Sequence, residues 1–407
     1  MASDLGVYIH FPWCRKLCPY CDFAVMVAHH EPPHEAYRDA VVAELAARAA
    51  AVEGRRLRSI YLGGGTPGLW RPDCVGDVVA AVLAAAAAPG PDALEITIEV
   101  NPTDVTAARL AAWRDAGVNR VSIGVQSFDA AELAALGRDH WAGDGPRAVE
   151  LALAAGLRSV SADLIAGTPA GLVAAPSSSP PSSSVAAARG APAASIAALI
   201  ATGVPHASVY ELTIEPRTRF GKLARRGALV PRPDDELAAL YEANHRALEA
   251  AGLEHYEISS YARPGHRAVH NSLYWSGAEY LGLGAGAASF ERRADGGACR
   301  PPRPPPGPTG GGPRPPRPDE VVELGADEVA VDRVWLALRT RDGAALAEVA
   351  ALPGAARLRA RLAAEGLAEE VDGRLRPTLR GFLFNDRLAR HVVDAADPAG
   401  YNRPPTS

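Results

Sequence analysis

The chain has few cysteines, and their placement argues against a disulfide framework. Of the 5 cysteines in 407 residues, three lie close together as Cys14, Cys18 and Cys21, and no fourth cysteine follows nearby. A structural zinc site takes four ligands and usually shows two C-x-x-C pairs. Cys74 and Cys299 have no evident partner in the sequence. We therefore expect a reducing compartment. A zinc or disulfide cluster is one interpretation of the three close cysteines, and a second follows from the motifs described below.

The sequence also lacks an excess of positive charge and a long hydrophobic run. Asp and Glu number 47 against 42 Lys and Arg, for a net charge of −5, which gives no reason to expect binding to nucleic acid. The longest apolar run, Val78 to Ala88, is too short to span a bilayer. No signal peptide is visible at the amino terminus. These absences predict a cytoplasmic protein with no transmembrane segment and no nucleic-acid partner.

Strand-like and helix-like segments alternate through the first half of the chain. The strand-like segments are residues 6–11, 59–62, 95–100, 120–125, 160–165 and 206–214. The helical ones are residues 34–52, 73–88, 106–116, 130–136, 146–155 and 194–202. Such alternation predicts an α/β fold with a parallel sheet.

Composition divides the rest of the chain. Residues 174–193, rich in Ala, Ser and Pro, and 296–318, rich in Pro, Arg and Gly, cannot bury enough apolar surface to order themselves. We therefore expect a domain over 1–290 with an insertion at about 174–193, a linker over 291–318, and a C-terminal domain over 319–395. Helical segments followed by a hairpin at 367–377 predict a small winged-helix-like α+β fold for that domain. Its mixed charge favours a structural or docking role over DNA binding.

Several short motifs accompany the cysteines and carry a resemblance. They are Tyr8-Ile9-His10, Gly63-Gly64-Gly65-Thr66-Pro67, Glu99-Val100-Asn101-Pro102, Gly124-Val125-Gln126-Ser127-Phe128, Leu136-Gly137-Arg138, Asp163-Leu164-Ile165, Leu212-Thr213-Ile214-Glu215-Pro216 and Tyr256-Glu257-Ile258-Ser259. In number and order they resemble the radical S-adenosylmethionine (SAM) superfamily and, within it, the oxygen-independent coproporphyrinogen III oxidase family. The resemblance implies a partial (β/α)6 TIM-like barrel. It also implies a [4Fe–4S] cluster on Cys14, Cys18 and Cys21, with SAM on the iron that lacks a thiolate.

The same resemblance implies a set of SAM-binding residues. They are Tyr8, Tyr20, Gly64, Gly65, Thr66, Glu99, Gln126, Arg138 and Asp163. Glycines allow the backbone to approach a ligand closely, and the polar side chains offer partners for the carboxylate, amino group and ribose. For Glu99, Arg138 and Asp163 the alternative is an ordinary loop charge or an internal ion pair.

Two features favour a heme chaperone branch of this family over the oxidase branch. Phe23 stands where the oxidase has a fourth cysteine, and only a short segment precedes Cys14. The run His270-Asn271-Ser272-Leu273-Tyr274-Trp275 matches an H-N-x-x-Y-W motif associated with heme binding in that branch. Imidazole is a common axial ligand of heme iron. We expect His270, Asn271, Tyr274 and Trp275 near the open mouth of the barrel; the alternative is a loop histidine followed by core aromatics.

One position departs from the family pattern. Many relatives have a histidine in the stretch Gly284-Ala285-Gly286-Ala287-Ala288-Ser289, where this chain has Ala288.

The expected function is binding of heme and its delivery to an unidentified acceptor protein, with an electron donor for the cluster as a further partner. The competing hypothesis is an oxidase that decarboxylates the propionates of coproporphyrinogen III by means of a 5′-deoxyadenosyl radical. A radical SAM enzyme acting on another substrate is the third.

Overall fold

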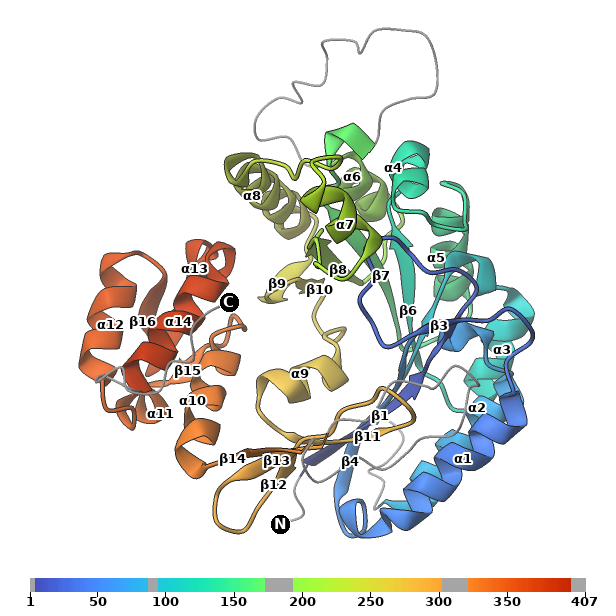
Figure 1. Ribbon diagram of the computed structural model, residues 1–407, viewed down its shortest axis with the longest axis horizontal. Helices are drawn as coiled ribbons and strands as arrows, with labels where there is room; N and C mark the ends of the chain where they lie inside the picture. Colours follow the sequence, from blue (N-terminus) through green and yellow to red (C-terminus); the bar gives the residue numbers. More distant parts are fainter. Residues whose placement is uncertain (1–3, 87–93, 173–192, 302–320, 397–407) are drawn as a thin grey trace, which may run out of the picture.

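A nine-stranded sheet curves through the larger part of the molecule (Figure 1). The computed structural model describes residues 4–86, 94–172, 193–301 and 321–396. The strands follow the order β11-β1-β4-β5-β6-β7-β8-β10-β9. Their bounds are β1 (Asp4–Phe11), β4 (Arg56–Gly64), β5 (Glu95–Val100), β6 (Arg120–Gln126), β7 (Ser159–Ala166), β8 (His206–Glu211), β9 (Glu254–Glu257), β10 (Ser260–Ala262) and β11 (Glu279–Leu283). All neighbours from β11 to β8 pair in parallel, which confirms the expected α/β fold.

Helices cover the outer face of this sheet (Figure 1). They are α1 (His34–Ala47), α2 (Pro72–Ala85), α3 (Ala107–Asp115), α4 (Ala130–Ala135), α5 (Asp144–Ala154), α6 (Ala194–Ala201) and α8 (Asp234–Ala250). The short helix α7 (Arg219–Arg225) packs instead on the cysteine loop, where the N–H of Phe220 donates to the Pro19 carbonyl. Ile60, Ile98 and Ile123, on three adjacent strands, are fully buried in the core between sheet and helices. Strands that are covered in this way are rich in apolar residues, and this composition is what allowed them to be predicted from the sequence.

The strand β10 reverses the direction of the chain. It pairs antiparallel with β8, so that Ala262 at its end lies opposite His206 at the start of β8. The segment that follows therefore emerges at the amino-terminal end of the parallel strands. There it forms α9 (Val269–Trp275) before returning as β11.

The C-terminal domain has a core of its own. It consists of α10 (Ala326–Ala337), β15 (Ala344–Ala345), α11 (Leu346–Ala350), α12 (Ala355–Ala364), β16 (Ala368–Val371), β17 (Arg374–Pro377), α13 (Leu379–Leu383) and α14 (Asn385–Ala396). Asp372 and Gly373 join β16 to β17 with positive φ angles of 53° and 73°, as a tight hairpin turn requires. Helices with a three-stranded sheet in the order β15-β17-β16 agree with the winged-helix-like expectation.

Part of the expected linker is ordered as a second small sheet. Residues 291–301 contain β12 (Glu291–Arg292) and β13 (Ala298–Arg300), which pair with each other. β13 also pairs with β14 (Val322–Leu324), which follows residues 302–320 in the sequence. The expectation of a plain linker is therefore wrong for these residues. The remainder of the linker and nearly all of the 174–193 insertion lie outside the described residues. None of the helices in the described part of the chain has the length and apolar character needed to cross a membrane.

Candidate functional site

The three close cysteines line one cavity, of about 580 Å³, at the carboxyl ends of the parallel strands. Cys14 ends the short strand β2 (Trp13–Cys14), which pairs with β3 (Met26–Val27), and Cys18 and Cys21 lie in the loop between them. Burial raises the pKa of Cys14 to about 11 and also raises the pKa of Cys21. A metal that binds these thiols therefore has to displace their protons.

Most of the predicted SAM residues line the same cavity. Tyr20, Gly64, Gly65, Thr66, Glu99, Gln126, Arg138 and Asp163 all contribute to its wall. They come from the carboxyl ends of β4, β5, β6 and β7 and from the loops beyond. Sites in folds of this type gather at that end because the strand-to-helix loops converge there.

Arg138 connects the cysteine loop to the strand ends. Its Nη1 lies 3.4 Å from Sγ of Cys18, and its Nη2 donates to Oδ1 of Asn101 at 2.6 Å and to the Gly124 carbonyl at 3.1 Å. Its Nε is buried and has no hydrogen-bond partner among the residues that the structure describes. Asn101, which also faces Thr66, was not among the predicted residues, although its position directly after β5 is the signal that could have found it.

Glu99 is held between two donors. The hydroxyl of Tyr61 donates to Oε1 at 2.7 Å, and the backbone N–H of Gly64 donates to Oε2 at 3.1 Å. Burial raises the pKa of Glu99 to about 7, against the opposing effect of these bonds. Gly64 has a φ of 110°, and a Cβ there would come within 2.5 Å of the His10 ring, so the position requires glycine.

Gln126 and Asp163 occupy neighbouring strands inside the cavity. Gln126 has a φ of 64°, which is unusual for a residue other than glycine and turns the chain at the end of β6. Asp163 accepts from the hydroxyls of Ser122 at 2.9 Å and Ser161 at 3.3 Å, and burial raises its pKa. The Asp163 carboxyl is thus hydrogen-bonded within the chain, the unusual angle at Gln126 is confined to its backbone, and both residues line the cavity.

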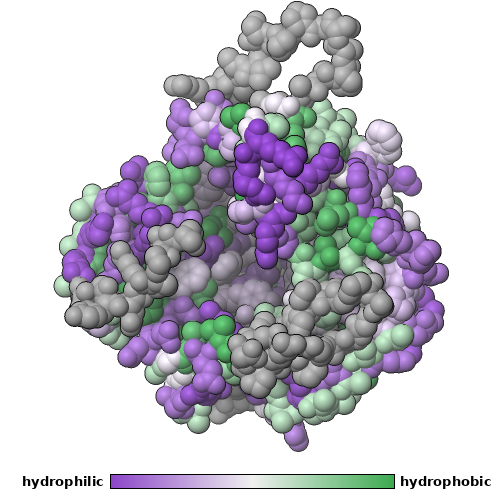
Figure 2. Space-filling model, viewed as in Figure 1, coloured by the Kyte–Doolittle hydropathy of each residue, from purple (hydrophilic) through white to green (hydrophobic). Residues whose placement is uncertain are grey.

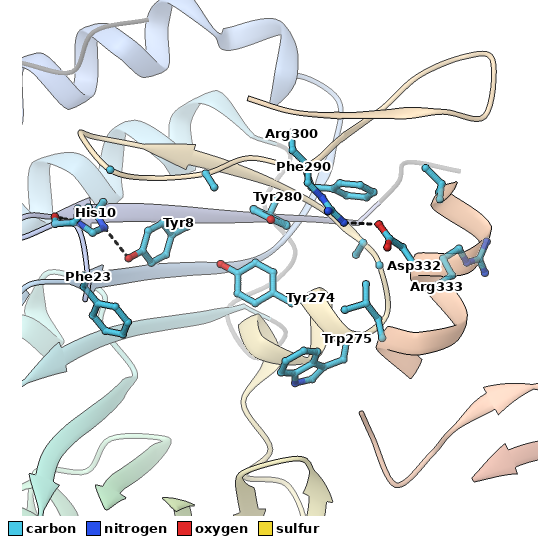
Figure 3. A pocket seen from close by; sticks show the side chains of 18 of the residues that line it. Tyr8, His10, Phe23, Tyr274, Trp275, Tyr280, Phe290, Arg300, Asp332 and Arg333 are labelled. Atoms are coloured by element: carbon cyan, nitrogen blue, oxygen red, sulfur yellow. Dashed lines mark hydrogen bonds and ion pairs between the residues drawn. The ribbon is translucent and has the colours of Figure 1, made fainter. Parts of the chain in front are cut away.

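Tyr8 lies in the wall of a second cavity, of about 550 Å³, beside the first. Tyr8, with its hydroxyl 3.0 Å from Nδ1 of His10, forms one end of it (Figure 3). The two cavities share Phe23, Gly64 and Glu99 as lining residues. Phe23 is 70% exposed and lines both. Sequence reasoning did not identify this second cavity.

Aromatic side chains form much of the second cavity, and the C-terminal domain closes one side of it. Tyr274, Trp275, Tyr280 and Phe290 come from α9, β11 and the loop after β11, while Val329, Asp332, Arg333 and Leu336 come from α10. Figure 2 shows the surface hollowed between the C-terminal helices and the barrel.

His270 does not lie at the open mouth of the barrel, and that expectation was wrong. It is 1% exposed, with Nδ1 2.8 Å from Oγ of Ser59 and Nε2 2.8 Å from the hydroxyl of Tyr274. Its backbone N–H donates to Glu95, the first residue of β5, at 3.0 Å. The antiparallel β10 is the cause, because it delivers α9 to the amino-terminal end of the sheet.

The motif residues after His270 differ in where they point. Tyr274, one turn further along α9, and Trp275 line the second cavity, whereas Asn271 lines neither of these two cavities. The Trp275 ring also faces the guanidinium of Arg339, 5.1 Å from its centroid. Of this motif, the Tyr274 phenol and the Trp275 indole are therefore the side chains at the aromatic cavity.

Sequence comparisons agree with this geometry. The profile of the radical SAM superfamily matches residues 8–170. Heme chaperone HemW of Escherichia coli (strain K12) is 41% identical over 286 residues, which cover 70% of this chain and 69% of the relative. Heme chaperone HemW of Mycobacterium tuberculosis (strain ATCC 25618 / H37Rv) is 34% identical over 404 residues, covering 96% of this chain and 95% of that one. The chain belongs to the HemW family.

A solved structure shares the fold of this HemW family member. Coproporphyrinogen III oxidase (HemN) from Escherichia coli, described as a radical SAM enzyme, superposes with a TM-score of 0.71 over 96% of this chain and 90% of that one. At 20% identity the likeness shows the fold alone.

Membership of the radical SAM superfamily implies a [4Fe–4S] cluster and SAM. The cavity fits them, since it brings together three thiols, the Arg138 guanidinium, whose Nε has no partner among the described residues, and the carboxyls of Glu99 and Asp163. Within the described residues no three His, Cys, Asp or Glu side chains converge on a single metal ion. A cubane cluster does not require that convergence, because each thiolate binds a different iron atom.

Proposed function

We propose that this protein binds heme and transfers it to an acceptor protein, and that it carries a [4Fe–4S] cluster and SAM. The observation that supports this most directly is the aromatic cavity beside the cysteine cavity, with Tyr274 and Trp275 of the H-N-x-x-Y-W motif in its wall. Flat aromatic side chains offer the large apolar area that a porphyrin ring needs. The names of the two relatives, both heme chaperones, agree with the proposal.

In this proposal Cys14, Cys18 and Cys21 hold the cluster, and the strand-end residues hold SAM. Arg138 lies beside Cys18, and its Nε has no hydrogen-bond partner among the described residues. This guanidinium can therefore bind the carboxylate of SAM. Asp163 and Glu99 offer acceptors to hydroxyl or ammonium groups at the opposite side of the cavity. The cluster and SAM together supply one-electron chemistry when bound, and these side chains bind and orient them.

Heme occupies the second cavity, with Tyr274 as the residue of the motif that meets the iron. The Tyr274 hydroxyl lies at the cavity, and His270 lies behind it at 2.8 Å. Burial lowers the pKa of His270 to about 3, so its ring is neutral and holds the Tyr274 hydroxyl through a hydrogen bond. Ferric iron bound to the phenol oxygen would itself have to displace the phenol proton, because burial raises the pKa of Tyr274. Phenolate is an established axial ligand of heme.

Two variants test which atom meets the iron. Tyr274→Phe removes the oxygen but keeps the ring, so it is expected to shift the Soret band and to weaken ferric heme binding. His270→Ala removes the hydrogen-bond partner that positions the Tyr274 hydroxyl, and is expected to weaken binding while leaving the same class of spectrum. If His270→Ala alone changes the ligation spectrum and Tyr274→Phe does not, His270 is the ligand and must rotate out of its buried position.

The proposed function is tested by anaerobic purification followed by heme titration, beside a turnover assay with coproporphyrinogen III. We expect saturable heme binding and no formation of protoporphyrinogen IX, because the side chain between the two cavities is Phe23 rather than a thiol. Transfer of bound heme to apoprotein acceptors completes the assay. Robust turnover of coproporphyrinogen with no heme binding would assign the protein to the oxidase activity instead.

A further inference from the structure

The second cavity has two chemically different ends. Near the cysteine cavity its wall is Tyr8, His10 and Phe23, while at the C-terminal domain its lining includes Arg300, paired with Asp332, and Arg333, whose guanidinium points away from the aromatic rings in Figure 3. Aromatic rings line the space between these ends. A cavity that is apolar along its length and cationic at one end suits a flat amphipathic ligand with anionic groups along one edge.

Arg300 is held above the aromatic wall. Its guanidinium lies 5.6 Å from the centroid of the Phe290 ring, and its Nη2 lies 2.5 Å from Oδ2 of Asp332 on α10. Stacking on an aromatic face orients a guanidinium while leaving its donors free to point outward. One of those donors is directed at a carboxylate in this structure.

Arg333 stands next to Asp332 on α10 and pairs with Glu348 on α11. Both ion pairs are partly exposed: Arg300 and Asp332 expose 40% and 21% of their side chains, and Arg333 and Glu348 expose 46% and 34%. Pairs in contact with water contribute little net stability. A ligand carboxylate can therefore replace Asp332 on Arg300 at little cost, and Arg333 can exchange Glu348 for a ligand carboxylate by turning its side chain toward the cavity.

We propose that Arg300 and Arg333 bind the propionate carboxylates of a tetrapyrrole that lies in the aromatic cavity. The inference rests on the proposed heme-binding function and deepens it by naming the groups that recognise the ligand's edge. Guanidinium groups bind carboxylates through charge-assisted, frequently bidentate hydrogen bonds. The macrocycle then lies between the aromatic wall and α10, with its far edge toward Phe23 and Glu99.

This arrangement gives the C-terminal domain a role in ligand binding. Arg333 and Asp332 belong to α10, whereas Arg300 belongs to β13 of the small sheet. The carboxylates of the ligand are thus held between two parts of the fold. Asp332 competes with the ligand for Arg300, so removing its charge should favour the ligand.

The test compares three ligands on the purified full-length protein: ferric heme, its dimethyl ester, and metal-free protoporphyrin. The wild-type protein should bind heme about tenfold tighter than the ester, in which the carboxylates are blocked. The double variant Arg300→Gln/Arg333→Gln should lose about tenfold in affinity for heme and for protoporphyrin alike, and little for the ester. Each tenfold corresponds to 1.4 kcal/mol. Asp332→Asn should tighten binding of heme and leave that of the ester unchanged.

Arg293→Gln is the matched control. Arg293 lies on the same hairpin, pairs with Asp295 and Glu323, and does not line the cavity. If the double variant binds heme as the wild type does, or if the ester binds as tightly as heme, the arginine proposal is wrong while heme binding stands. If the wild type binds neither heme nor protoporphyrin, the proposed function fails and this inference fails with it.

Discussion

The cysteines differ in what surrounds their sulfur atoms, and this difference leads to a direct prediction. Cys14, Cys18 and Cys21 face one cavity, whereas Cys74 is fully buried in α2 and Cys299 lies in β13. Alanine at any one of the first three should abolish the absorption of a reconstituted cluster and its content of about four irons and four sulfides, as expected for a [4Fe–4S] centre. Cys299→Ala is the control and should keep both. A cluster retained in the triple variant would contradict the assignment.

Glu99 predicts how stability depends on pH. Its carboxyl in the folded protein has a pKa of about 7, raised above the unfolded value by burial. The folded state therefore binds this proton more tightly than the unfolded state does, and stability falls as pH rises from about 4.5 to 7. Because the residue is only half-buried and lines two cavities, we expect an effect of about 1–2 kcal/mol.

Glu99→Gln removes this titration while keeping an acceptor for Tyr61 and Gly64. Denaturant unfolding at pH 5 and pH 8 should therefore show a smaller difference in the variant than in the wild type. Glu53→Gln, at an exposed position, should leave the wild-type difference unchanged. An unchanged pH dependence in Glu99→Gln would show that Glu99 is not the titrating group.

At the scale of elements, α9 is positioned by a single carboxylate. The backbone N–H groups of Val269 and His270 donate to the two oxygens of Glu95 at 2.9 and 3.0 Å. The first N–H groups of a helix have no partner within it, and a carboxylate there both accepts their bonds and complements the helix dipole. Glu95 thus fixes the helix that carries Tyr274 and Trp275.

Glu95→Ala should lower the free energy of unfolding by about 1–3 kcal/mol, because buried donors lose their partner. It should also weaken heme binding, since α9 loses its anchor, while the iron content of the reconstituted cluster is unchanged. Glu95→Gln keeps an acceptor and should be the milder variant. Equal heme affinity in Glu95→Ala and the wild type would show that α9 is held by other contacts.

Elements were predictable from the sequence to the extent that their contacts are local. The parallel strands β1, β4, β5, β6, β7 and β8 and the Asp372-Gly373 hairpin follow from strand-like segments and turn residues, and the structure confirms them, whereas β11 was not predicted. The pairing of β13 with β14 was not predictable, because composition around Gly296 suggests a linker and the partner strand lies far along the chain. The motif identified His270, but its burial could not be predicted from the sequence. That burial depends on the direction of β10, which is set by contacts between residues far apart in the chain.

At the scale of the whole molecule, the two domains meet through backbone bonds and a stacked arginine. The N–H of Ile258 donates to the Arg339 carbonyl, and the N–H of Arg341 donates to the Tyr256 carbonyl, each at 3.0 Å. The Arg339 guanidinium lies 5.1 Å from the centroid of the Trp275 ring and 5.1 Å from that of Trp335. One indole belongs to α9 and the other to α10, so this cation joins the two sides of the aromatic cavity.

Arg339→Gln should therefore loosen the C-terminal domain and weaken heme binding together. Cation–π contacts contribute about 0.5–2 kcal/mol each, so losing two of them should cost about 1–3 kcal/mol. Limited proteolysis should cut faster between the larger domain and the C-terminal domain, and heme affinity should fall severalfold. The cluster and SAM binding should persist, because they belong to the cysteine cavity. Arg390→Gln, at an exposed position of α14, is the control. Faster proteolysis with unchanged heme affinity would show that the aromatic cavity binds its ligand without the C-terminal domain, because α10 would then contribute nothing to the affinity.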